Sequence, residues 1–151
     1  MYLAVALLLT MRVTFYAPEA GGVNGDLFMA DGNEAHTGYA ACGPRYPFGT
    51  VFEIMADVSE YGVPQVVECR DRGGYVGTAN LDLVIRTGDP KKDMEFARAW
   101  GRRSVPVRVW ANWGDYVAGT QAEYDKTVQT AAASPAGRSS QREQMNPTPI
   151  P

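Results

Sequence analysis

The chain has 151 residues, of which 45% are hydrophobic, which is enough for one domain with its own core. A net charge of -3 argues against nucleic acid or an anionic membrane as the main partner. Two cysteines and one histidine form neither a disulfide framework nor a metal-ligand pattern, and no glycine-rich nucleotide motif is present. We therefore expect no metal and no cofactor.

Residues 1–10 form a strongly apolar run. The run is too short to cross a bilayer as a helix, so we expect no membrane span. It has the length of a signal hydrophobic region but lacks a basic start and a small-residue cleavage site. Three interpretations stay open: a signal-like segment, a true start at Met11, or an apolar arm that packs on a neighbouring subunit.

Short strand patterns separated by turns follow this run. Residues 12–16 alternate polar and apolar side chains, as half-buried strands do, and the glycine-rich residues 17–37 are typical of a long loop. Further strands are expected at 38–42, 51–55, 65–70, 81–85 and 104–110. Many short strands with one short helix predict a mainly β protein, a small closed barrel with extended termini.

The one short helix is expected to start at Asp89-Pro90, because Asp can cap free N–H groups and Pro suits the first turn. Gly101 is placed to end it. A local basic cluster, typical of a solvated face rather than a phosphate site, consists of Arg98, Arg102, Arg103 and Arg108.

The composition changes after Trp110. Residues 124–133 predict a weak helix, and residues 134–151, rich in Pro, Ser and Gln, are expected to be disordered when alone. We therefore divide the chain into an apolar arm or signal-like segment (1–10), a barrel domain (11–113) and a tail (114–151).

Two aspartates are the leading candidates for chemistry. Asp71 opens a Gly-broken turn after the strand 65–70, and Asp82 lies between Leu81 and Leu83 in the next strand. A carboxyl group in an apolar strand needs a partner or a role, and two carboxyls that meet in a sheltered place allow one to keep its proton. The alternatives are that Asp71 only bonds the backbone of its turn, and that Asp82 faces water at the barrel rim.

The order of the motifs resembles the double-psi β-barrels, over residues 12–110. The motifs are Val13-Thr14-Phe15-Tyr16, Ala30-Asp31-Gly32, Pro47-Phe48-Gly49-Thr50, Asp71-Arg72-Gly73-Gly74, Leu81-Asp82-Leu83 and Trp100-Gly101-Arg102-Arg103. Within that group the chain looks most like the three-aspartate (3D) domain of membrane-bound lytic transglycosylase A, and in part like rare lipoprotein A. The resemblance implies a six-stranded barrel that cleaves peptidoglycan glycan strands without net hydrolysis.

The resemblance also implies roles for single residues. Asp71 would be the acid/base that protonates the glycosidic oxygen and later takes a proton from the muramyl 6-hydroxyl, with Asp82 as its neighbour. Gly73, Gly74 and Thr50 would help to bind the glycan. Aromatic residues that are candidates to stack on sugar rings, with core packing as the alternative, are Tyr16, Tyr39, Tyr46, Tyr75 and Trp113, of which Tyr75 is preferred because it adjoins Asp71.

Cys42 stands where the 3D pattern has its third aspartate. The resemblance places the segment of Cys42 beside that of Cys69, where a disulfide would stabilise the fold by about 3 kcal/mol. Two reduced, buried cysteines are the alternative. His36 matches no motif and is interpreted as a surface residue.

Three functions remain open. The first is a peptidoglycan-cleaving, lytic transglycosylase-like enzyme in the cell envelope, periplasm, extracellular space or a phage virion. The second is a non-catalytic structural or interaction barrel in a phage particle or envelope assembly, which contacts other subunits through the N-terminal arm and the C-terminal tail. The third is a barrel that binds glycan without cutting it.

Overall fold

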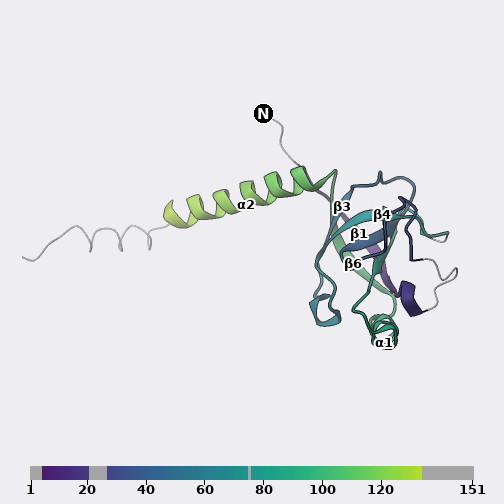
Figure 1. The fold of residues 1–151 in the computed structure, drawn as a ribbon. Coiled ribbons are helices and arrows are strands. Elements are labelled where there is room, and N and C mark those ends of the chain that lie inside the picture. The colour runs from purple at the N-terminus through teal and green to yellow at the C-terminus, as the bar shows by residue number, and fades with distance from the viewer. Residues whose placement is uncertain (1–4, 21–26, 75, 134–151) are drawn as a thin grey trace, which may run out of the picture.

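The computed structural model describes residues 5–20, 27–74 and 76–133, which contain a closed six-stranded β-barrel (Figure 1). The strands are β1 (Leu7–Tyr16), β2 (Tyr39–Cys42), β3 (Val51–Ile54), β4 (Val66–Asp71), β5 (Asn80–Val84) and β6 (Arg103–Trp110). Their order around the barrel is β1-β5-β2-β4-β3-β6. The pairs β1–β5 and β2–β4 are parallel and the others antiparallel. The predicted small β-barrel is confirmed, and its mixed pairing is compatible with a double-psi barrel.

Alternate residues of each strand fill the barrel, as the period of two requires. In β1, Met11, Val13 and Phe15 are buried in the core, so the residues between them face outward. In β5 the core residues Leu81 and Leu83 flank Asp82 in the same way. The polar side chains of these strands therefore share the outer surface of the barrel.

The short helix α1 (Pro90–Trp100) has the predicted ends. The Asp89 side chain accepts hydrogen bonds from the backbone N–H groups of Lys91 and Lys92, and Gly101, with φ 66°, terminates the helix. Trp100 packs into the core, and its Nε1–H donates to the Val13 carbonyl at 3.0 Å. This contact fixes α1 against β1.

The first strand begins earlier than the sequence pattern predicts. β1 starts at Leu7 rather than at residue 12, because residues 7–10 pair with residues 106–109 of β6. Leu7 and Leu8 are exposed on this extension, which explains why no alternation marked it as strand. Residues 1–4 of the predicted arm lie outside the described residues.

A second and longer helix, α2 (Trp113–Ala133), begins eleven residues before the predicted 124–133. Its first turns pack on the barrel: Gly119 lies so close to the Trp110 ring that a Cβ there would be 2.1 Å from it, and Glu123 pairs with Arg108 at 3.1 Å. Beyond these contacts α2 projects away from the barrel (Figure 1). Neither α1 nor α2 is long and apolar enough to cross a membrane.

The four arginines of the basic cluster differ in their contacts, and Arg98, Arg102 and Arg103 are exposed. Arg103 donates to the Trp100 carbonyl, and Arg108 pairs with Glu53 and Glu123. Arg102 instead lines a cleft on the barrel surface, beside Asp82.

Candidate functional site

A β-bulge at the end of β4 decides where Asp71 points. Cys69 of β4 pairs with Ala40 of β2, but Ala41 pairs with Asp71, so Arg70 is an extra residue on β4. Without this bulge the alternation would turn Asp71 into the barrel, as it turns Cys69. With it, Asp71 shares the outer surface with Ala41.

Asp71 accepts three hydrogen bonds there. Its Oδ2 accepts from the Tyr16 hydroxyl at 2.9 Å, and its Oδ1 accepts from the backbone N–H groups of Ala30 and Arg72, each at 2.8 Å. The contact with Arg72 is the local turn bond expected of an Asp at this place. The contacts with Tyr16 and Ala30 come from distant segments, so Asp71 also fastens β1 and the long loop to the end of β4.

Among the described residues, one side chain donates a hydrogen bond to Asp82. Its Oδ1 accepts a hydrogen bond from the Thr14 hydroxyl at 2.8 Å. Burial raises the pKa of Asp82 above its ordinary value, the Thr14 bond lowers it, and the negative charge of Asp71 raises it further. The net effect is a pKa of Asp82 above the ordinary aspartate value, caused chiefly by burial.

The two aspartates lie on either side of one alanine. Ala41 pairs with Asp71 of β4 on one edge of β2 and with Asp82 of β5 on the other. Since neighbouring strands are about 4.8 Å apart, the two Cα atoms are separated by about 10 Å. Thr14 of β1 pairs with Asp82 and extends the same row, so one line across the sheet carries Thr14, Asp82, Ala41 and Asp71.

Tyr16 reaches along this row to Asp71. It lies two residues after Thr14 on β1, and its hydroxyl bonds Asp71 on β4, past the two strands between them. Burial, followed by the negative charge of Asp71, raises the pKa of Tyr16 far above its ordinary value. The phenol therefore stays protonated and remains a hydrogen-bond donor to Asp71.

A surface cleft of about 420 Å³ opens beside Asp82. Its lining includes Arg12, Thr14, Val76, Asn80, Asp82 and Arg102. This volume is in the range of small-ligand sites. Asp82 is therefore the aspartate of the pair that lines this cleft, and Asp71 is not among the lining residues.

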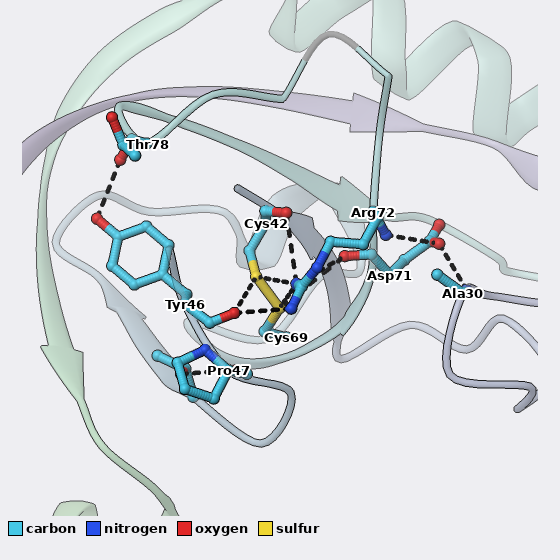
Figure 2. The surroundings of a disulfide bond; sticks show 9 residues. Ala30, Cys42, Tyr46, Pro47, Cys69, Asp71, Arg72 and Thr78 are labelled. Carbon is cyan, nitrogen blue, oxygen red and sulfur yellow. Dashed lines mark hydrogen bonds between the residues drawn. A yellow bond between two sulfur atoms is a disulfide. The ribbon is translucent and has the colours of Figure 1, made fainter. Parts of the chain in front are cut away.

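The two cysteines are joined by a disulfide, with their Cα atoms 5.7 Å apart. Figure 2 shows the Arg72 side chain lying over this bond, while the Asp71 carboxylate points away from it toward Ala30. Arg72 Nη1 lies 2.8 Å from the sulfur of Cys42 and 2.9 Å from that of Cys69, and Nη2 donates to the Tyr46 carbonyl at 2.8 Å. The disulfide and Arg72 thus hold β2, β4 and the Asp71 turn together.

The other predicted site residues lie apart from the cleft or outside the described part of the chain. Thr50 is buried and donates its hydroxyl to the Pro47 carbonyl at 2.7 Å. Gly73 belongs to the turn, where a Cβ would lie 2.3 Å from the Val76 side chain, so this position requires glycine, and Gly74 is exposed. Tyr75, the preferred aromatic, lies outside the described residues. His36 is exposed, as expected of a surface residue.

The remaining aromatic candidates divide between the core and the site. Tyr46 packs edge-on against Phe52 with ring centroids 5.1 Å apart, and its hydroxyl donates to the Thr78 carbonyl. Trp113 donates its Nε1–H to Glu68 at 2.8 Å. Of the aromatic candidates that the structure describes, Tyr16 is the one that contacts an aspartate of the pair. Within the described ranges no three His, Cys, Asp or Glu side chains are grouped closely enough to hold a metal ion.

Sequence reasoning missed the partners of the two aspartates, Thr14 and Tyr16, and the arginines of the cleft, Arg12 and Arg102. The alternation in residues 12–16 was a usable signal, because it places Arg12, Thr14 and Tyr16 on one face of one strand. Comparison with known proteins gives no further guidance, since no protein-family model and no curated protein matches the chain.

Proposed function

We propose that this chain is a peptidoglycan-cleaving enzyme of the lytic transglycosylase type on a 3D-like double-psi barrel, with Asp82 as the general acid/base. The observation that carries the proposal is the pairing of Asp71 and Asp82 on either side of Ala41, with Asp82 beside a cleft. A glycan lying in the cleft would bring its glycosidic oxygen to a carboxyl group whose pKa is raised, chiefly by burial.

The proposal gives the proton to Asp82 rather than to Asp71 for two reasons. Asp82 lines the cleft and its pKa is raised, chiefly by burial. Asp71 accepts three hydrogen bonds and is held by Tyr16 and two backbone N–H groups. These contacts engage both oxygens of Asp71 and hold its carboxyl group in place, and Asp71 is not part of the cleft lining.

The reaction would use one carboxyl group twice. Asp82 donates its proton to the glycosidic oxygen as the bond from that oxygen to the anomeric carbon breaks, so the proton leaves with the departing sugar, and positive charge develops on the remaining sugar ring. The negative charge of Asp71 favours this state. The Asp82 carboxylate then removes the proton from the 6-hydroxyl of the same sugar as its oxygen attacks the anomeric carbon, which closes an anhydro ring and restores the acid without consuming water.

Mass spectrometry of the products from purified sacculi tests this proposal. We expect anhydro-muramyl products from the native chain. The rate at which they form should fall by at least about a hundredfold in Asp82→Asn, because removal of an acid/base group has an effect of this size. The rate should fall by a smaller factor in Asp71→Asn. Asp125→Asn, which changes an exposed aspartate of α2, is the matched control. Absence of anhydro products from the native chain would refute the enzymatic function.

The Cys42–Cys69 disulfide supports a location outside the reducing cytoplasm, in the cell envelope, periplasm, extracellular space or a phage virion. Peptidoglycan belongs to the cell envelope, and proteins in the other listed places can reach it. Growth of the producing cell with a thiol-trapping reagent, followed by mass measurement of the chain, tests this part of the proposal. Free thiols at both positions in the native source would contradict it.

A second candidate, a structural or interaction barrel, is favoured by α2. Val117, Tyr124 and Val128 are exposed on the helix, and Leu7 and Leu8 are exposed on the β1 extension. Apolar side chains so placed are typical of surfaces that contact another subunit. The candidate predicts an assembly of the full chain in light scattering that is lost in V117S/Y124S/V128S. A monomer at all concentrations would count against self-assembly.

A further inference from the structure

Two arginines stand at the end of the cleft beside Asp82. Arg12 is two residues before Thr14 on the outer face of β1, and it pairs in register with Asn80 as Thr14 pairs with Asp82. Arg102 directly precedes Arg103, which pairs with Val13 on the other edge of β1. Both line the cleft although they come from segments far apart in sequence.

Within residues 5–20, 27–74 and 76–133, Arg70, Arg86 and Arg108 form ion pairs, but Arg12 and Arg102 form none. Both side chains are exposed. Two unpaired cations in one cleft repel each other, so an anion between them gains from both.

We propose that Arg12 and Arg102 form a subsite for a carboxylate carried by the glycan, next to the bond that Asp82 would act on. The inference rests on the proposed function for its choice of a glycan, but the charge preference is a property of the cleft itself. It specifies the substrate class: a saccharide with a free carboxylate, rather than a neutral polymer such as one of N-acetylglucosamine alone.

The order of charges across the sheet supports this assignment. From β6 through β1 and β5 to β4 the outer surface presents Arg102, then Arg12 and Thr14, then Asp82, and finally Asp71. A carboxylate held at the arginine end is kept away from Asp71, which would repel it. The sugar that bears it therefore enters the cleft in one orientation, with its neutral face toward Asp82.

Binding measurements with two matched probes test the subsite. The probes are a disaccharide of N-acetylglucosamine and N-acetylmuramic acid with a free lactyl carboxylate, and the same disaccharide as its methyl ester. Calorimetry on the full native chain should give a dissociation constant about tenfold lower for the acid, since a charge-assisted contact has this magnitude. The preference should shrink as salt is added.

The double variant R12Q/R102Q should bind the two probes equally, and K91Q/R98Q, which removes the same charge from exposed positions of α1, should keep the preference. Equal affinity of the native chain for both probes, including no measurable binding of either, would overturn the subsite, as would a preference that survives in R12Q/R102Q. If the chain cleaves sacculi but binds both probes equally, only the subsite is refuted. If the chain prefers the acid probe but does not cleave sacculi, only the enzymatic function is refuted.

Discussion

Replacing Thr14 by valine is expected to raise the pKa of Asp82. The Thr14 hydroxyl donates to Asp82 Oδ1 at 2.8 Å, and this is the contact that stabilises the ionised form. Valine has nearly the same shape but no donor. Its methyl group also keeps water away from the carboxyl group, which acts in the same direction.

The size of the change follows from the strength of this bond. A hydrogen bond to a charged group contributes about 1.5–3 kcal/mol, and we take the lower end because Asp82 is only partly buried. Since 1.4 kcal/mol corresponds to about one pH unit, the titration midpoint of Asp82 should move upward by about one pH unit.

Carbon-detected NMR of the Asp82 carboxyl, assigned by its absence in Asp82→Asn, measures this midpoint without relying on activity. Thr127→Val is the control, because its hydroxyl donates within α2 to the Glu123 carbonyl. If the chain cleaves glycan, the pH at which Thr14→Val loses half of its rate should move upward as well. An unchanged or lower midpoint in Thr14→Val would refute the idea that the Thr14 hydroxyl stabilises the Asp82 carboxylate.

Three further outcomes are expected. Because burial raises the pKa of Asp82 in the folded state, the native chain should lose stability as the pH rises from the ordinary aspartate pKa through the raised pKa of the folded state. The variant Asp82→Asn should lack this loss of stability. Its midpoint of thermal unfolding near neutral pH should therefore be higher than that of the native chain. Tyr16→Phe removes one donor from Asp71 and should cost about 1 kcal/mol in urea unfolding; no change would mean that water replaces the hydroxyl. The variant C42A/C69A should lose about 3 kcal/mol relative to the oxidised native chain, and equal stability of the two would contradict a structural role for the disulfide.

The parts of the fold set by local sequence were predictable. Asp89, Pro90 and Gly101 fix the ends of α1 through capping and backbone preference, which depend on neighbouring residues alone. Alternation located most strands to within two residues, and it singled out Asp82 between two core leucines. A polar residue in such a pattern is visible without knowledge of the fold.

The parts of the fold that depend on long-range strand register were not predictable from the sequence. Nothing in the sequence near Asp71 indicates that Arg70 is extra against β2, or that the Tyr16 hydroxyl arrives from β1. The same holds for the early start of α2, where the packing of Gly119 on Trp110 stabilises a turn that contains a helix-disfavouring residue. Such contacts depend on how the barrel closes, which only the three-dimensional structure specifies.

The extra residue in β4 also shows that a change of one residue in strand register would move an acidic side chain off the outer surface of the barrel. Inserting one residue into β2 between Ala40 and Ala41 would give Arg70 a partner and leave both acids in the sequence, yet the regular pairing would turn Asp71 toward the interior, where a charge is costly. A one-residue insertion can therefore change which face of the barrel an acid occupies without altering a single acidic residue. Homologous chains are then better compared by strand register than by which acids they retain.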